Sequence, residues 1–328
     1  MNTNPKFIPT QIVKSFVTDE YNMKLLSDPK LIYSLENSTW LLKTDAGKYY
    51  LKVFRNDSID EIQREINLYT ELKNVEIYTP EVIENKRCKK VSILNFEKNC
   101  YSVMLMTEVK LRKLTSSTIT KEEITTLISA VARMHNYMST NIYCNTYKNN
   151  STVESDKGFS FYGIFKGSEN YKVLSETNRL KVRELDNKIV DYLGKNYPSL
   201  TESYSLIHGD LFLEQMGLSE KNEVFMFDFA DSSWGPVAQE LAVFLNHLYR
   251  SDEISFDRWE ELRKWVLDSY QSINKFSNAD LDSIKPLIIR RIVLELSYLY
   301  QVSIELKVEV DPIGNNHRLE LAEYLLSQ

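Results

Sequence analysis

The pattern of apolar residues changes near Lys110, and this change constrains the fold more than any other feature of the sequence. Before it, short runs rich in β-branched and aromatic residues predict strands, with one amphipathic helix among them. After it, apolar residues recur mainly at helical spacing. The sequence therefore predicts an α+β chain with two lobes, a sheet-rich lobe over residues 1–107 and a larger, mainly helical lobe over residues 108–328.

The first lobe is expected to contain an antiparallel sheet. Strands are predicted over Thr39–Lys43 and Tyr49–Phe54, and the intervening Thr44–Lys48 contains an Asp and a Gly that suit a tight hairpin turn. A helix is predicted over Ser58–Leu72, because apolar residues follow helical spacing after a Ser suited to an N-cap. Two further strands are expected over Lys90–Leu94 and Tyr101–Met106.

The second lobe is predicted to be mainly helical, with one exception. Within Ser203–Phe229, the runs Tyr204–Ile207 and Val224–Phe227 resemble strands and bracket a polar loop. Amphipathic helices are expected over Lys121–Met138, Asn178–Leu193, Trp259–Ile273, Asp280–Glu305 and Asn316–Leu326.

Composition argues against several classes of protein. The net charge of −6 over 328 residues lacks the basic surface that nucleic-acid binding requires. Three cysteines, Cys88, Cys100 and Cys144, form no C-x-x-C pair, so neither a disulfide framework nor a thiolate zinc site is indicated, and a cytoplasmic location is expected. No apolar run is long enough to cross a membrane, and Met1–Phe16 lacks the core of a secretory signal. Nothing in the sequence indicates an oligomeric state.

Two aspartates follow the two strand-like runs of the exceptional segment. Asp210 comes shortly after Leu206-Ile, and Asp228 comes directly after Phe225-Met-Phe. Residues at the ends of short strands are held by a rigid scaffold that can aim them into a cleft. The segment therefore has the outline of a catalytic site.

The motifs around these aspartates are His208-Gly-Asp210-Leu, Asp228-Phe, Gly235-Pro and Glu240-Leu-Ala. They resemble the aminoglycoside phosphotransferase family, part of the protein-kinase-like superfamily that also contains choline kinases and one type of homoserine kinase. The resemblance implies a two-lobed protein-kinase-like fold in which Asp210 is the catalytic aspartate and Asp228 the main Mg²⁺ ligand. Carboxylates suit both roles, because phosphoryl transfer depends on positioning the acceptor hydroxyl and neutralising phosphate charge.

The first lobe contains the lysine and glutamate that a kinase requires. Lys52 lies on the second hairpin strand, and Glu65 lies 13 residues later on the following helix. The resemblance implies that Lys52 contacts the phosphates of ATP or GTP and that Glu65 orients it. It also implies a nucleotide-covering turn and a purine-binding hinge. The turn includes Asn37 and Ser38, and the hinge comprises Thr107, Glu108 and Val109.

The sequence departs from the family pattern at three positions. Gln215 stands where the family has Asn as second metal ligand, so a carbonyl oxygen is kept but lies one methylene further from the backbone. Phe212 replaces a His, and Glu240 replaces an Asp that is interpreted as supporting the loop. These departures leave a nucleotide-binding regulatory pseudokinase as an alternative to an active phosphotransferase.

The charge of the second lobe favours an amine-bearing acceptor. The lobes carry formal charges of +1 and −7, and a negative field attracts cations. The leading hypothesis is an O-phosphotransferase that inactivates an antibiotic of the aminoglycoside or amicoumacin type, and the enzymatic alternative is a metabolic kinase for homoserine or a choline-like alcohol. Candidate acceptor-binding acids are Asp231 and Glu214, with further acids around Glu253, Glu295 and Glu305.

Overall fold

The structure of the protein is a computed structural model that describes residues 8–34, 37–55, 58–141, 144, 184–185, 187–193, 195, 203–250, 254–306 and 312–328. The chain forms two compact units. The first comprises Met1–Arg112 and Ser219–Ala230, and the second comprises Lys113–Leu218 and Asp231–Gln328. The division predicted after residue 107 differs, because it did not assign a late segment to the first unit. As a division into domains it stays a prediction.

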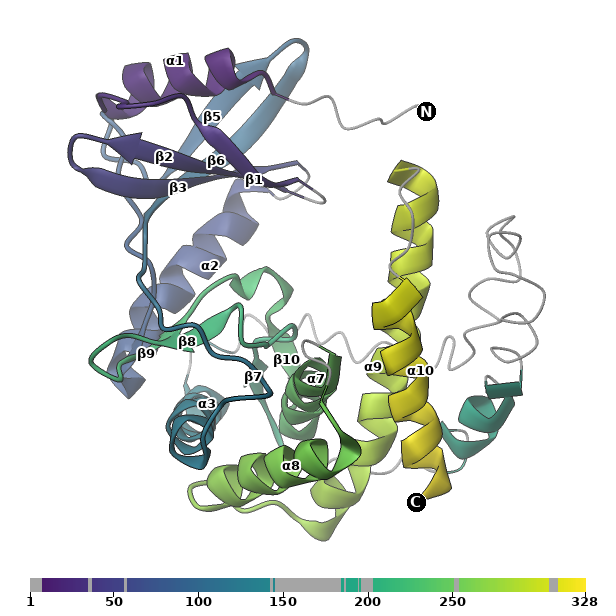
Figure 1. Ribbon diagram of the computed structural model, residues 1–328. Helices are drawn as coiled ribbons and strands as arrows, with labels where there is room; N and C mark the ends of the chain where they lie inside the picture. The colour runs from purple at the N-terminus through teal and green to yellow at the C-terminus, as the bar shows by residue number, and fades with distance from the viewer. Residues whose placement is uncertain are drawn as a thin grey trace. The chain divides into compact units, whose positions relative to one another are not determined.

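The first unit contains a five-stranded antiparallel sheet in the order β1-β2-β3-β6-β5 (Figure 1). The predicted hairpin is confirmed: Thr44 pairs with Gly47, whose φ of 138° is accessible because glycine has no Cβ. Lys52 lies on the central strand, paired with Thr39 on one side and Met104 on the other. The strands are β1 (Lys30–Ser34), β2 (Ser38–Thr44), β3 (Gly47–Phe54), β5 (Val91–Phe96) and β6 (Asn99–Thr107).

Each face of this sheet is covered by one helix. Val13 and Val17 of α1 (Thr10–Tyr21) share a core cluster with Leu51 of β3, whereas α2 (Ile59–Leu72) packs against Phe54. Side chains alternate along a strand, so Lys52 points to the same face as Phe54, the face that α2 covers. The sequence did not predict α1.

The helix α2 begins where its sequence indicates. The Ser58 hydroxyl accepts the Glu61 N–H, and the Glu61 carboxylate accepts the Ser58 N–H, which forms a reciprocal capping box. After α2 come a short 3₁₀ turn, η1 (Lys73–Val75), and β4 (Ile77–Tyr78). The strand β4 pairs in parallel with β9 (Val224–Met226), which attaches the late segment to the first unit.

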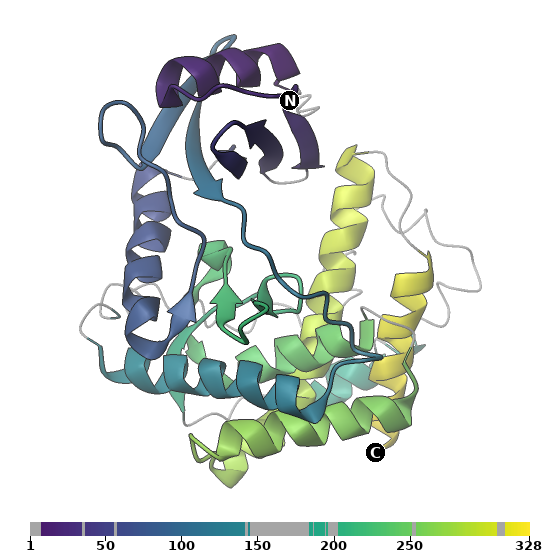
Figure 2. The same ribbon diagram turned by 60° about the vertical axis from the view of Figure 1, so that its left-hand side comes forward.

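The second unit is mainly helical. Its α3 (Lys121–Thr140) lies along α8 (Phe256–Gln271), and α7 (Val237–Arg250) packs against α9 (Asn278–Leu306), which also contacts α10 (Pro312–Ser327) (Figures 1 and 2). The other elements are β7 (Tyr204–Ile207), which pairs antiparallel with β10 (Ser233–Pro236), the strand β8 (Met216–Leu218) and the 3₁₀ turn η4 (Phe229–Asp231).

The predicted α+β class, with an antiparallel sheet followed by a mainly helical part, is confirmed. The helices expected over Lys121–Met138, Trp259–Ile273, Asp280–Glu305 and Asn316–Leu326 are present with ends shifted by a few residues. The helix expected over Asn178–Leu193 is helical at 184–185 and 187–193, and its beginning lies outside the described residues. Within the described ranges, no helix combines the length and hydropathy needed to span a membrane.

Candidate active site

Lys52 and Asp228 meet within the first unit although 176 residues separate them in the sequence. Lys52 Nζ lies 2.6 Å from Asp228 Oδ1 and 4.9 Å from the centre of the Phe54 ring. The lysine side chain is 9% exposed, while that of Asp228 is 43% exposed. The lysine is therefore fixed by protein, and the carboxylate retains an open side that can meet a ligand.

Two residues of α2 hold the backbone at Asp228. Glu65 Oε1 accepts the Phe229 N–H at 3.1 Å and the Tyr69 hydroxyl at 2.6 Å, and the Tyr69 oxygen accepts the Asp228 N–H at 3.4 Å. These bonds stabilise Asp228 at a φ of 64°, in the left-handed region that costs a non-glycine residue about 1 kcal/mol. Burial, together with the nearby Glu65 carboxylate, holds the pKa of Tyr69 well above its usual value, so Tyr69 remains a donor.

The predicted nucleotide-covering turn lies at the start of β2. Asn37 Oδ1 accepts the Arg55 N–H at 3.2 Å, which ties this turn to the end of β3, and Ser38 is the first residue of β2. Both residues are partly exposed. Their contact with a nucleotide stays a prediction.

The predicted hinge begins at the last residue of β6, Thr107, and continues through Glu108 and Val109. The Thr107 N–H bonds to the Glu81 carbonyl at 3.0 Å, and the Glu108 N–H bonds to the Lys48 carbonyl at 3.1 Å. Lys48 also pairs with the Glu108 carboxylate at 3.1 Å. No described backbone group engages the Val109 N–H, and contact of these three residues with a purine base stays a prediction.

In the second unit, a buried carboxylate fixes the loop that precedes Asp210. Glu240, fully buried in the first turn of α7, accepts the His208 N–H at 2.8 Å and the Gly209 N–H at 2.9 Å, one on each oxygen. Gly209 has a φ of 86°, and a Cβ there would lie 2.4 Å from the Asp231 carbonyl oxygen. The loop therefore requires glycine at this position, and the Glu240 carboxylate fixes the backbone N–H groups of residues 208 and 209.

Asp210 is held by side chains from two helices. Arg291 of α9 forms an ion pair with Asp210 Oδ1 through Nη2, and His247 Nε2 of α7 lies 3.7 Å from the same oxygen. Burial opposes ionisation, but His247 and Arg291 lower the pKa of Asp210 to about 2. Asp210 is therefore a carboxylate at neutral pH.

Near Asp210, the Glu295 carboxylate is surrounded by three arginine side chains. Its side chain is 8% exposed and pairs with Arg291 Nε at 2.7 Å, Arg250 Nη1 at 3.0 Å and Arg318 Nε at 3.0 Å. Sequence reasoning proposed Glu295 as a site for an ammonium group, whereas the structure engages its carboxylate with three guanidinium groups. Glu253 and the side chain of Glu305 lie outside the described residues.

Gln215 fits a metal ligand better than its substitution for Asn suggests. Its Oε1 is buried and has no hydrogen-bond partner among the described residues, and its Nε2 lies 3.5 Å from Asp210 Oδ2. A buried carbonyl oxygen without a donor is the kind of group that a hard cation satisfies, and the half-exposed Asp228 carboxylate is another. The described residues contain no group of three or more His, Cys, Asp or Glu that could hold a metal, so a bound Mg²⁺ would also need oxygens from nucleotide and water.

The two predicted acceptor-binding acids are exposed. Glu214 and Asp231 have side chains open to solvent, and their role in binding an acceptor stays a prediction. Phe212, which replaces the His of the family pattern, stacks on His247 with ring centroids 4.4 Å apart. It therefore closes one side of the imidazole that lies beside Asp210.

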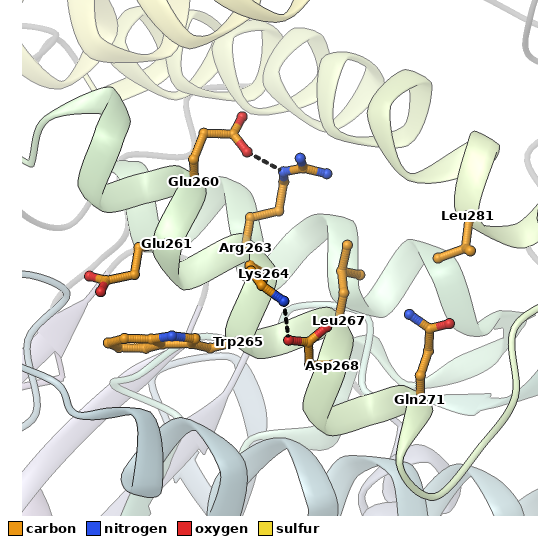
Figure 3. A pocket seen from close by; sticks show the side chains of 9 residues that line it. All are labelled: Glu260, Glu261, Arg263, Lys264, Trp265, Leu267, Asp268, Gln271 and Leu281. Carbon is orange, nitrogen blue, oxygen red and sulfur yellow. Dashed lines mark hydrogen bonds and ion pairs between the residues drawn. The ribbon is translucent and has the colours of Figure 1, made fainter.

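A surface hollow on the second unit contains none of these residues. It is lined by α8 and by Leu281 of α9 (Figure 3). Figure 3 shows two ion pairs along α8, Glu260 with Arg263 and Lys264 with Asp268, each joining residues one helical turn apart. Such pairs are typical of a solvated helix face, so this hollow is not a candidate active site.

The family model described as "Phosphotransferase enzyme family" (APH) matches residues 32–275, about three quarters of the chain. The chain belongs to this family. The resemblance inferred from the motifs around Asp210 and Asp228 is thereby confirmed, and the chain is an enzyme of the small-molecule phosphotransferase class. No curated protein sequence matches it.

Solved structures of phosphotransferases share the fold over nearly the whole chain. The amicoumacin kinase hAmiN, in complex with AMP-PNP, Ca²⁺ and Ami, is 17% identical with a TM-score of 0.71, covering 98% of this chain and 94% of that one. Spectinomycin phosphotransferase APH(9)-Ia, in complex with ADP and spectinomycin, is 12% identical with a TM-score of 0.68, covering 98% and 99%. A microcompartment-associated aminopropanol kinase is 16% identical with a TM-score of 0.67, covering 97% and 96%.

Proposed function

We propose that this phosphotransferase moves the γ-phosphate of ATP or GTP, with Mg²⁺, to a hydroxyl group of a small amine-bearing molecule in the cytoplasm. The observation that carries the proposal is the 2.6 Å pair between Lys52 Nζ and Asp228 Oδ1. A lysine that binds phosphate and an aspartate that binds the metal must both serve one nucleotide, and this pair brings the two groups together from distant parts of the sequence.

The residues divide the chemistry between them. Lys52 would bind phosphate oxygens, Asn37 and Ser38 would cover them, and the hinge would hold the base. Asp228 and Gln215 would hold Mg²⁺, which when bound neutralises charge on the phosphates. Asp210 would accept a hydrogen bond from the acceptor hydroxyl as its oxygen bonds to the γ-phosphorus. The bond from that phosphorus to the bridging oxygen breaks, ADP or GDP leaves, and the hydroxyl proton passes to Asp210 and then to solvent.

An amine-bearing antibiotic is the proposed acceptor. Two of the similar structures are named as an amicoumacin kinase and a spectinomycin phosphotransferase, and the second lobe carries a formal charge of −7. The exposed acids Asp231 and Glu214 would contact an ammonium group. Phosphorylation of such a compound would inactivate it, which makes antibiotic resistance the proposed role.

A metabolic kinase is the second candidate, and the charges around Asp210 favour it for one class of acceptor. Arg250 retains a side-chain exposure of 27%, so a carboxylate on the acceptor could pair with its guanidinium group. Homoserine carries a carboxylate on its α-carbon, beside an ammonium group, whereas a choline-like alcohol has an ammonium group and no carboxylate. An acceptor with an ammonium group and no carboxylate would present only like charge to Arg250.

The test is Mg²⁺-dependent transfer of labelled γ-phosphate from ATP and from GTP to a panel of small molecules. The panel holds aminoglycosides, spectinomycin, amicoumacin-type compounds, homoserine and choline, with Asp210→Asn as the control variant. Transfer to an antibiotic that Asp210→Asn reduces by about 10²-fold supports the leading proposal. Preference for homoserine or choline supports the metabolic kinase. Nucleotide binding without transfer to any acceptor supports the regulatory pseudokinase and contradicts both.

A further inference from the structure

The carboxylate of Asp210 has two oxygens in very different surroundings. Oδ1 is paired with Arg291 and faces His247 at 3.7 Å. Oδ2 makes a single, long contact among the described side chains, 3.5 Å from Gln215 Nε2. The Asp210 side chain is 25% exposed, so a ligand can reach it. The oxygen that remains available to an acceptor is therefore Oδ2.

We propose that Arg291 is a positioning residue of the phosphotransfer reaction: it holds Oδ1 of Asp210 so that Oδ2 receives the acceptor hydroxyl. This inference rests on the proposed function, in which Asp210 binds the acceptor. Arg291 itself touches neither acceptor nor nucleotide in this role.

The contacts of Arg291 suit it to fix an orientation. Its Nη2 meets Asp210 Oδ1, its Nη1 meets the Gly209 carbonyl at 3.4 Å, and its Nε meets Glu295 Oε1 at 2.7 Å. A guanidinium group is planar and its N–H directions are rigid, so three contacts determine both its place and its plane. One residue thus contacts the catalytic side chain and the backbone immediately before it.

Glu295 provides the fixed point for Arg291. It lies one helical turn further along α9. Its Oε1 pairs with Arg291 and lies 3.5 Å from His247 Nε2, and its Oε2 pairs with Arg250 and Arg318. Burial acts to raise the pKa of Glu295, but His247 and the three arginines outweigh it and hold the pKa below the usual range. Because Glu295 stays ionised and its two oxygens have separate partners, Arg291 has one preferred position.

The test compares Arg291→Ala and Arg291→Lys with wild type and with Arg263→Ala. Arg263 is a matched control, because it forms an ion pair with Glu260 on the solvated face of α8 (Figure 3). The assay is Mg²⁺-dependent release of ADP from ATP, or GDP from GTP, with water and with the best acceptor of the panel. Arg291→Ala should lower kcat by about 10²-fold, the cost of a misplaced reacting group, with little change in nucleotide KM.

Two readouts separate positioning from general damage to the fold. Added guanidinium ion should restore part of the kcat of Arg291→Ala and leave Arg263→Ala unchanged, and Arg291→Lys should fall between wild type and Arg291→Ala. A lysine can reach Asp210 or Glu295 but has no rigid fork to hold both. Thermal melts identify a variant that fails to fold. If Arg291→Ala does not fold, Arg291→Lys is compared with wild type instead.

The outcomes distinguish this inference from the proposed function. If Asp210→Asn is inactive while Arg291→Ala and Arg291→Lys keep the wild-type kcat, the positioning role is wrong and the function stands. If Asp210→Asn transfers phosphate as wild type does, the role proposed for Asp210 fails. A crystal structure of Arg291→Ala decides the inference without activity: a rotated Asp210 carboxylate supports it, and an unmoved carboxylate overturns it.

Discussion

Replacement of Glu240 by Gln tests how strongly one buried carboxylate holds the loop before Asp210. Glu240 accepts two backbone N–H groups, one on each oxygen, at 2.8 and 2.9 Å. Gln keeps the shape and one acceptor oxygen, but its amide nitrogen then faces an N–H donor. The variant therefore loses one bond to a charged acceptor and leaves one backbone N–H without a partner.

The expected loss of stability follows from these two contacts. A hydrogen bond to a charged group contributes about 1.5–3 kcal/mol, and an unsatisfied buried donor costs about 1–3 kcal/mol. The two contributions overlap, so they are not simply added. Burying the Glu240 charge also costs free energy, as its raised pKa indicates, and Glu240→Gln removes that cost. We expect a net decrease of about 2 kcal/mol in the free energy of unfolding.

Urea unfolding followed by tryptophan fluorescence and by far-UV circular dichroism measures this decrease. Coincident curves from the two probes justify a two-state analysis, and a lower midpoint at unchanged slope reports lost stability. Glu240→Asp is the matched control, because it keeps the charge but is one methylene shorter, and it should lose less than Gln. Equal midpoints for wild type and Glu240→Gln, to within about 0.5 kcal/mol, would refute the reasoning.

Three further substitutions test the proposed nucleotide and metal ligands and the ion pairs around Glu295. Lys52→Met should weaken binding of a fluorescent ATP or GTP analogue by about tenfold, because the variant lacks the ammonium group that would bind the phosphates. An unchanged Kd would contradict this. Gln215→Asn, which restores the family residue, should lower the Mg²⁺ concentration for half-maximal transfer, and an identical Mg²⁺ dependence would remove Gln215 from the metal site. Glu295→Gln should destabilise the protein by about 3 kcal/mol at pH 7. Burial acts to raise the pKa of Glu295, but four neighbouring groups lower it more strongly, so the ion pairs stabilise the fold only while Glu295 is ionised. The loss of stability should therefore shrink as the pH falls below 4.5. A loss that does not change with pH would be inconsistent with an ion-pair origin.

The sequence predicted the helices and strands whose ends are marked by turn or capping residues. The hairpin around Gly47 and the helix after Ser58 were predictable, because turn and cap residues act within a few positions. The helix α1 lacks such signals: its N-cap, Pro9, offers no side-chain bond, and its first turn has no acid. In α7, buried polar residues interrupt the apolar pattern that would indicate a buried helix. They are Glu240, Asn246 and His247.

In the candidate site, residues within sequence motifs were predictable, and residues brought there only by helix packing were not. Asp210 and Asp228 lie within motifs, so the sequence alone identified them as candidates, and their roles stay predictions. Arg291 lies 81 residues beyond Asp210, and nothing around it in the sequence distinguishes it from a surface arginine. Its place beside Asp210 arises from helix packing, because α9 packs against α7.

The parallel pair between β4 and β9 has a consequence for synthesis of the chain on the ribosome. The first unit needs Ser219–Ala230, so it cannot be completed when residue 112 emerges. Roughly a hundred further residues must be translated first, which takes on the order of ten seconds at typical rates. During that interval β4 lacks its partner strand, and Lys52 lacks the carboxylate that it pairs with in the finished protein. Until β9 is synthesised, the backbone of β4 therefore remains open to pairing with another strand or to binding by a chaperone.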